Sequence, residues 1–288
     1  MISKNSKNYL VKKQMLKLTK ENLFCGKRIR VFLSMEKYID NEIDKAEDKY
    51  INDYIEAIRD FNQENETIKS YNGRQLLELL QNCDDEKSKK VLIKLDKQKN
   101  EISIHNNGTP FSKKGYRSLF IPNLSSKTDR RKYIGNKGLG FRSIINWSSS
   151  IEIHSNNISL KYSEKNRVVN FNILFNTSEQ EKIRKDEDIA ENIIPFPFLT
   201  LPEVKRINQV KRINQEKYIT SVIINYTDEA YEGIIEQVKK ITPETILFLK
   251  SIKTIKFEGF DEEIKDISTQ RKRINQNIED FSPKEKVT

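Results

Sequence analysis

The stretch ELLQNCDDE, residues 78–86, continues the leucine-rich run GRQLLELL and combines apolar with acidic and amide side chains. The spacing of the apolar residues predicts a helix from Asn72 to about Asp85. At about 100° per residue, Glu78, Asn82 and Asp85 fall within one narrow stripe, and the leucines occupy the other side. The stripe either faces water, as on most amphipathic helices, or lines a ligand site. The helix alone does not decide between these interpretations.

The composition is that of a polar protein. Its 288 residues are 36% hydrophobic and 33% charged, enough material for one large domain or two small ones. No apolar run approaches the roughly 18–20 residues that a membrane span needs, and no signal peptide is visible at the start. Two cysteines, Cys25 and Cys83, are too few for a disulfide framework or a cysteine-rich metal site. We therefore expect a cytoplasmic protein that does not enter a membrane.

The net charge of +10 is distributed unevenly along the chain. Residues 1–30 and 111–142 each carry nine Lys/Arg and one acid, whereas residues 31–70 carry eleven acids and five bases. A basic excess is typical of nucleic-acid or phosphate contact. A generally lysine-rich and asparagine-rich composition produces the same excess, so DNA is an open alternative as a partner. The basic pentapeptide KRINQ occurs three times, either as a neutral insertion or as a contact patch.

Hydrophobic periodicity predicts an α+β protein with one mixed or antiparallel sheet covered by helices. A loop rich in Ser, Lys, Arg and Gly is expected from Gly108 to Gly138. Helices are predicted at 5–23, 34–62, 139–147, 231–241 and 243–252, and strands at 91–96, 101–106, 151–155, 158–163, 168–175, 220–226 and 253–260.

Two glycine-bearing loops follow the helix that contains Glu78. The first is IHNNGTPFS (104–112), at the end of a strand, and the second is YIGNKGLGFRSI (133–144), which precedes a helix. Glycines let the backbone approach an anion closely, and the N-terminus of the following helix favours negative charge. The second loop is neither a Walker A loop, because no Gly-Lys-Ser/Thr closes it, nor a Rossmann turn, because no strand leads directly into it.

The acid-Asn-Asp helix, the strand that ends in Asn-Gly, the long loop and the G-x-x-G-x-G motif together resemble the GHKL ATPase superfamily, which includes gyrase, the ninety-kilodalton heat-shock chaperone, histidine kinases and MutL. The motifs YNGRQLLELLQNCDDE and IGNKGLGFRSI are most similar to sacsin-like ATP-binding domains, as is ITPETILFLKSIKTIKF (241–257). The resemblance implies a GHKL (Bergerat-type) two-layer α/β sandwich at 33–262, with a mixed, mostly antiparallel sheet and helices on one face. A basic arm, 1–32, would precede it, and a polar tail or further region, 263–288, would follow.

The same resemblance implies a site for ATP and Mg²⁺. Glu78 would be the general base that activates the attacking water, and Asn82 would bind the metal that neutralises phosphate charge. Residues 111–134 would form a lid over the nucleotide. The other implied ATP-binding residues are Asp85, Asn106, Asn107, Gly108, Lys127, Gly135, Asn136, Lys137, Gly138, Leu139, Gly140, Phe141 and Thr220. For the two lysines a solvated loop position is an equal alternative, and for the threonine an ordinary strand position is.

The chain departs from the family pattern at the adenine end. Where the D-x-G-x-G motif has an Asp and a second Gly, this sequence has Asn106 and Pro110. The side-chain oxygen of an Asn can accept a hydrogen bond from the adenine amino group, but it is uncharged and binds more weakly. His105 is interpreted as a strand-end residue, because nothing in the sequence pairs it with a nucleophile.

The function implied is slow Mg²⁺-dependent ATP hydrolysis that drives a conformational or dimerisation cycle, in a chaperone-like or a bacterial DNA-processing or defence system. Relatives complete the site with a Lys or Arg from a second domain, so we expect weak activity in isolation and a homodimer or partner protein. The alternative is a nucleotide-gated module that binds protein or DNA without hydrolysis. A third possibility is a DNA-binding protein with a degenerate pocket.

Overall fold

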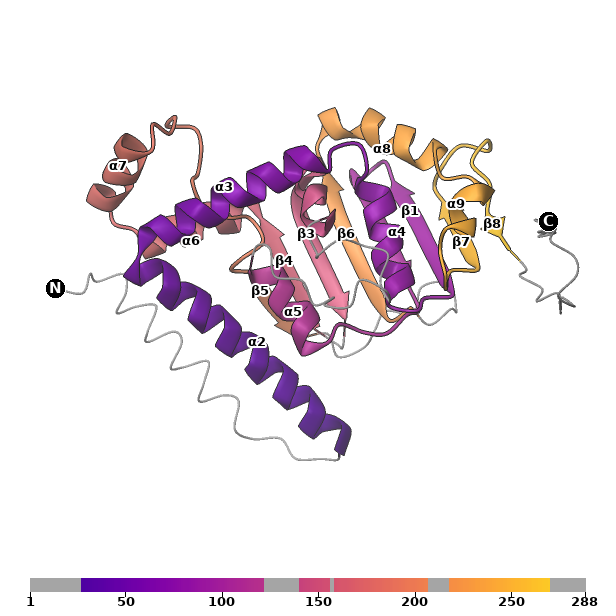
Figure 1. The fold of residues 1–288 in the computed structure, drawn as a ribbon, viewed down its shortest axis with the longest axis horizontal. Coiled ribbons are helices and arrows are strands. Elements are labelled where there is room, and N and C mark those ends of the chain that lie inside the picture. Colours follow the sequence, from indigo (N-terminus) through magenta and orange to yellow (C-terminus); the bar gives the residue numbers. More distant parts are fainter. Residues whose placement is uncertain (1–26, 122–139, 156–157, 207–217, 270–288) are drawn as a thin grey trace, which may run out of the picture.

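The computed structural model describes residues 27–121, 140–155, 158–206 and 218–269. They form two layers, an eight-stranded sheet and a set of helices, with α4 and α5 lying in front of the sheet in Figure 1. The helix predicted at 5–23 lies outside the described residues. No helix in the described part of the chain is long and apolar enough to cross a membrane.

The sheet has the strand order β5-β4-β3-β6-β2-β1-β7-β8. Every pairing is antiparallel except that of β1 with β7, which is parallel. The prediction of a two-layer sandwich with a mixed, mostly antiparallel sheet is therefore confirmed. The strands are β1 Lys90–Asp96, β2 Glu101–Asn106, β3 Ser148–Ser155, β4 Ile158–Ser163, β5 Glu203–Arg206, β6 Thr220–Tyr226, β7 Thr254–Glu258 and β8 Ile267–Ser268.

The main core lies between the sheet and the helices. Leu76, Leu79 and Leu80 of α4 are at most 2% exposed and pack with apolar side chains of β1, β2, β3, β4 and β6. The helices are α2 Lys27–Asn52, α3 Tyr54–Ser70, α4 Gln75–Asp85, α5 Lys113–Phe120, α6 Glu164–Leu174, α7 Thr177–Asp186, α8 Tyr231–Lys239 and α9 Pro243–Leu247, with 3₁₀ turns η1 Gly140–Trp147 and η2 Asp228–Ala230.

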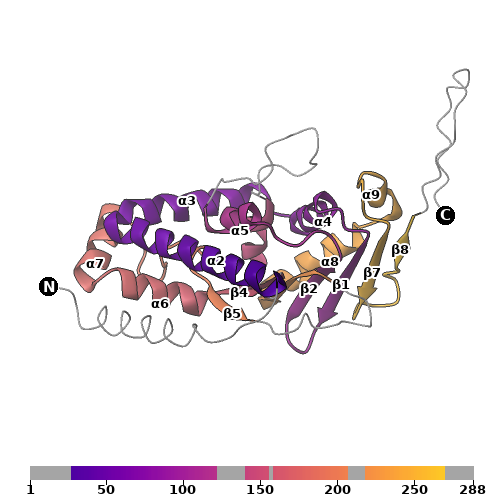
Figure 2. The ribbon, with the colours of Figure 1, turned by 90° about the horizontal axis from the view of Figure 1, so that it is seen from below.

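The single helix predicted at 34–62 is two helices. The break falls at Asp53, whose backbone is extended (φ −150°) and whose side chain accepts a hydrogen bond from the Ile55 backbone N–H, so that it caps α3. Periodicity did not reveal the break because apolar spacing continues through it. In consequence α2 diverges from α3 in Figure 1, and it lies along α3 and α5 in Figure 2.

The strand predicted at 168–175 is wrong, because these residues belong mostly to α6. Ser163 ends β4 and caps the helix by accepting from the Asn166 backbone N–H at 3.2 Å. The β-branched residues of the run suggested a strand, yet its buried aromatic residues, Phe171 and Phe175, are spaced four apart, as on a helix, with ring centroids 5.4 Å apart. They join Tyr50 and Phe196 in a second, smaller hydrophobic cluster.

The loop predicted from Gly108 to Gly138 is also wrong in part, because it contains α5. Ser112 caps this helix through the Gly115 backbone N–H. Tyr116, Leu119 and Phe120 are each at most 4% exposed, so the first part of the segment belongs to the core. The helix predicted at 243–252 is likewise shorter than expected, since α9 ends at Leu247.

Candidate functional site

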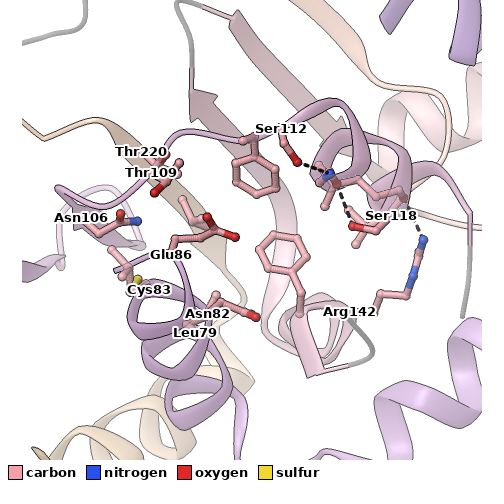
Figure 3. A pocket seen from close by; sticks show the side chains of 17 residues that line it. Leu79, Asn82, Cys83, Glu86, Asn106, Thr109, Ser112, Ser118, Arg142 and Thr220 are labelled. Carbon is pink, nitrogen blue, oxygen red and sulfur yellow. Dashed lines mark hydrogen bonds between the residues drawn. The ribbon is translucent and has the colours of Figure 1, made fainter. Parts of the chain in front are cut away.

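A cavity of about 90 Å³ lies between α4, the ends of β2 and β6, and the segment that contains α5 (Figure 3). One wall consists of Leu79, Asn82, Cys83 and Glu86, which are three or four positions apart and share one side of α4 and its C-terminal cap. The other lining residues are Ile104, Asn106, Thr109, Phe111, Ser112, Gly115, Ser118, Leu119, Phe141, Arg142, Leu199, Thr220 and Val222.

Asn106 is a polar group in this mainly apolar cavity. It is 6% exposed, and its Oδ1 accepts a hydrogen bond from the Gly108 backbone N–H at 3.0 Å. A backbone N–H can only donate, so the side-chain oxygen must face the turn and the amide nitrogen must face the other way. This nitrogen has no hydrogen-bond partner among the residues that the structure describes. Figure 3 shows the amide at the edge of the cavity that also contains Glu86.

Three strands bring polar groups together next to Asn106. Thr220 is paired with Asn106 on β2 and with Ser155 on β3, so the ends of the three strands meet. The hydroxyls of Ser155 and Thr220 are 2.9 Å apart, and Ser155 also accepts from the Phe111 backbone N–H at 3.0 Å. The start of the α5 segment is thus anchored to the strand ends.

Asn107 and Gly108, the next two residues, position the cavity wall rather than line it. Asn107 Oδ1 accepts from the backbone N–H groups of Lys89 and Lys90 at 2.9 and 3.0 Å, and so fixes the start of β1. A Cβ on Gly108 would lie 2.5 Å from the backbone oxygen of Glu86, so only glycine permits this approach. The Thr109 backbone N–H then donates to the same oxygen at 2.7 Å.

Glu78 lies beside the cavity, against the first residue of η1. Its side chain is almost fully buried, and a Cβ on Gly140 would overlap its carboxylate. Arg74 Nη2 is 3.6 Å from Glu78 Oε1 and contributes a salt bridge. The predicted polar stripe therefore does not face water as a whole: Glu78 is buried under the glycine backbone, and Asn82 lines the cavity.

Asp84, which the sequence did not single out, anchors the far side of α4. It is 2% exposed, and its carboxylate accepts the backbone N–H groups of residues 250, 251 and 252 at 2.8, 2.6 and 2.9 Å. These hydrogen bonds fix the backbone of the segment between the end of α9 and the start of β7. No sequence period shows such a contact, because the partners are more than 160 residues apart.

A buried ion pair supports the α5 side of the cavity. Arg142 lines the cavity, is 2% exposed, and bonds Glu64 Oε1 at 2.5 Å and the Leu119 backbone oxygen at 2.8 Å. Glu64 of α3 also accepts the backbone N–H groups of Phe198 and Leu199. Both charges are paired and hydrogen-bonded, which is the condition under which ions are tolerated in a core.

The described residues from the predicted site thus fall into two groups. Asn82, Asn106, Phe141 and Thr220 line the cavity. The second group does not line the cavity and consists of Glu78, Asp85, Asn107, Gly108 and Gly140. All of these except Asp85 contact residues next to the cavity or fix the position of its wall. Lys127, Gly135, Asn136, Lys137, Gly138 and Leu139 lie outside the described residues, as do positions 122–134 of the predicted lid. Glu86 was missed, although its spacing from Asn82 and Cys83 on α4 was a signal for it.

The opposite face of the sheet carries a separate polar row. The His105 ring nitrogens lie 2.7 Å from Ser221 Oγ and 3.0 Å from Ser103 Oγ. Burial, with smaller contributions from Lys94 and His154, lowers the pKa of His105 to about 4. On the same face, the imidazole of His154, with Nε2 2.9 Å from Glu152 Oε1, lowers the pKa of Glu152 to about 2. His105 is satisfied by its two serines, and none of these groups lines the cavity.

The described residues include no group of three or more His, Cys, Asp or Glu side chains able to hold a metal ion by themselves. A magnesium ion held jointly by one side chain and by phosphate oxygens does not require such a group. Asn82, with an amide oxygen on the cavity wall, is of the right chemical type.

No family model matches the chain. Protein NO VEIN of Arabidopsis thaliana is 35% identical over 98 residues, which are 33% of this chain and 4% of that protein. The chain thus spans only a small part of this curated relative.

Distant likenesses to solved structures also exist. The ATPase region of Saccharomyces cerevisiae topoisomerase II gives a TM-score of 0.39 at 12% identity, over 67% of this chain and 49% of that chain. The ATPase and transducer domains of DNA topoisomerase II from Balamuthia mandrillaris give 0.38 at 11%, over 68% and 48%. The chain spans about half the length of each. At these TM-scores the likeness does not by itself decide the function of this chain.

Proposed function

We propose that this chain is a nucleotide-binding module of the GHKL type, which binds ATP with Mg²⁺ and hydrolyses it slowly. The observation that carries the proposal is Asn106, more than nine-tenths buried, with its amide nitrogen unpartnered among the described residues beside a cavity. Because this nitrogen is not fully buried, it is open to the cavity that Asn106 lines, where a ligand with an acceptor can form a hydrogen bond with it. The neighbouring α4 wall supplies the second requirement, an amide oxygen one turn from a carboxylate.

In this proposal Asn82 and Glu78 have separate tasks. Mg²⁺, held by Asn82 and by phosphate oxygens, would neutralise phosphate charge. Glu78 would orient a water molecule and take its proton at the carboxylate. The close approach of Gly140 supports this role, because its backbone would hold the carboxylate in one position.

The size of the cavity requires part of its wall to move when a nucleotide enters. Pockets that bind drug-sized ligands measure roughly 300–1,000 Å³, several times the 90 Å³ found here. Phe111, Ser112, Gly115, Ser118 and Leu119 all come from the α5 segment, which makes that segment the wall to displace. The proposed lid, 111–134, therefore begins with α5.

The module would extend over residues 33–262, and its cycle would involve a homodimer or a partner protein that completes the site. Chaperone-like, sacsin-like and bacterial DNA-processing or defence systems are the settings we propose for it. Residues 1–32 and 263–288 would be flanking basic and polar regions.

One observation favours a second candidate, a nucleotide-gated interaction module without hydrolysis. Glu78 forms a salt bridge to Arg74 and does not line the cavity, an arrangement that would suit a structural carboxylate. Intact Glu78 and Asn82 one turn apart favour hydrolysis over this alternative.

Calorimetric titration of the full chain with ATP and ADP, with and without Mg²⁺, followed by a turnover assay, tests the proposal. We expect Mg²⁺-dependent ATP binding and slow phosphate release. Tight binding without any turnover supports the second candidate. No binding of either nucleotide, together with DNA binding that falls steeply as salt rises, contradicts both and supports the DNA-binding alternative.

A further inference from the structure

The direction of the Asn106 amide changes what this residue can offer to a base. The resemblance implied that its oxygen accepts from the adenine amino group, but that oxygen already bonds the Gly108 N–H at 3.0 Å. The group that lacks a partner in the described chain is the amide nitrogen, which is a donor. A ligand that satisfies Asn106 must therefore present an acceptor, such as a ring nitrogen.

Glu86 supplies the complementary acceptor. It is the one acidic residue among the described cavity-lining residues, and its carboxylate extends into the cavity in Figure 3. A carboxylate has about four acceptor positions, so it can accept from a ligand in addition to any protein partner.

The positions of Glu86 and Asn106 are fixed relative to each other by backbone contacts. The Glu86 backbone oxygen accepts from the Thr109 N–H at 2.7 Å and lies against Gly108, where a side chain would collide with it. Asn106 is bonded to the same glycine. The backbone segments that carry the donor and the acceptor are thus held together by one turn, which reduces the entropy lost on binding.

We propose that Asn106 and Glu86 together read the edge of an adenine base, with Asn106 Nδ2 donating to ring nitrogen N1 and the Glu86 carboxylate accepting from the 6-amino group. This inference rests on the proposed function, and it makes Glu86 a specificity-determining residue.

Guanine could also pair with a donor and an acceptor, through O6 and N1–H. A carboxylate that accepts from N1–H can accept from the neighbouring 2-amino group as well. The donor–acceptor pair alone therefore does not distinguish adenine from guanine, and analogues that change single groups of adenine are needed.

The test compares nucleotide analogues on the full chain by calorimetry with Mg²⁺. The 1-deaza analogue of ATP lacks the N1 acceptor, and purine riboside triphosphate lacks the 6-amino group. We expect the unmodified chain to bind each analogue about five- to tenfold more weakly than ATP, the loss typical of one hydrogen bond.

Two variants assign each loss to its residue. Asn106→Asp keeps an oxygen for the Gly108 N–H but removes the donor, so it should bind ATP and 1-deaza-ATP equally. Glu86→Ala leaves the backbone bond to Thr109 in place and should bind ATP and purine riboside triphosphate equally. Glu232→Ala, at an exposed position on α8, is the matched control and should keep both discriminations.

The outcomes separate the inference from the proposed function. Normal ATP binding with no discrimination against either analogue overturns the inference and leaves the proposed function standing. Tighter ATP binding by Asn106→Asp, with 1-deaza-ATP bound as well as ATP by the unmodified chain, shows that position 106 works as an acceptor and also overturns it. No ATP binding by the unmodified chain overturns both.

Discussion

His105 and Asn106 are neighbours on β2 but face opposite sides of the sheet, and the two sides differ in hydrogen bonding. Both ring nitrogens of His105 have serine partners, whereas the amide nitrogen of Asn106 has none in the described part of the chain. Histidine is chemically the more reactive type, but here it is a satisfied structural residue. The unpartnered amide donor that lines a cavity, rather than the more reactive side chain, marks the proposed ligand side of this sheet.

The largest expected effect concerns the ion pair behind the cavity. Glu64→Ala leaves Arg142 as an unpaired buried charge and removes the acceptor of two backbone N–H groups. We expect the free energy of unfolding to fall by about 3–5 kcal/mol, measured by urea denaturation. Glu66→Ala, an exposed position on the same helix, should change it by less than about 0.5 kcal/mol. Equal effects would show that the pair contributes no special stability.

The second prediction concerns His105, on the face of the sheet opposite the cavity. The pKa of His105 is about 4 in the folded protein and 6.5 in an ordinary environment, so the unfolded chain takes up its proton first as pH falls. The stability that neutral His105 provides is complete above pH 6.5 and is lost between pH 6.5 and 4, by roughly 3 kcal/mol in total.

His105→Gln cannot titrate, and it isolates this contribution from that of carboxylates. The difference in unfolding free energy between the two proteins should shrink as pH is lowered from 6.5 to 4 and then stay constant. ATP binding at neutral pH should be unchanged by the substitution. A difference that does not vary with pH would mean that His105 is not held neutral.

The third prediction returns to the cavity side. Glu78→Ala should reduce turnover by about 10²-fold or more, equivalent to roughly 2.7 kcal/mol of barrier, with ATP binding retained. Asn82→Ala should instead weaken Mg²⁺-dependent ATP binding, because it would remove the proposed protein ligand of the metal. Calorimetry and a phosphate-release assay on both variants, with Glu232→Ala as control, separate the two roles. Two variants that bind and turn over ATP normally would contradict the proposed site.

The sequence predicted the sheet and α4 because their periodicity is local. β1, β2 and β6 alternate or cluster apolar residues within a few positions, and these strands were found where expected. The α6 segment was predicted as a strand because it contains β-branched residues. In the structure these residues face outward, as Val169 does at 44% exposure, so their β-preference is not supported by packing against the core. The α5 helix has a loop-like composition and is stabilised by tertiary burial: Tyr116 is fully buried, and its hydroxyl donates to the backbone of Ser155 at the end of β3.

The candidate site was predictable in part for the same reason. Glu78 and Asn82 stand out through their spacing on one helix. The direction of the Asn106 amide depends on the Gly108 N–H in a turn, and the position of Glu86 depends on its contact with Thr109, more than 20 residues away. Such contacts are set by how two loops approach in space, and no single-sequence pattern records them.

The smallest expected effect compares two buried tyrosines on the cavity side. The Tyr116 hydroxyl of α5 donates to the Ser155 backbone oxygen at 2.8 Å, whereas the Tyr162 hydroxyl of β4 has no partner among the described residues. Tyr116→Phe should lower the free energy of unfolding by about 1 kcal/mol. If α5 must move to admit ATP, the same loss weakens the closed form, so ATP affinity should rise by up to about fivefold. Tyr162→Phe should leave ATP affinity unchanged and stability equal or slightly higher. The opposite signs for stability and affinity in Tyr116→Phe are what a movable wall requires. If denaturation and calorimetry instead show both quantities falling together, α5 is a fixed part of the site.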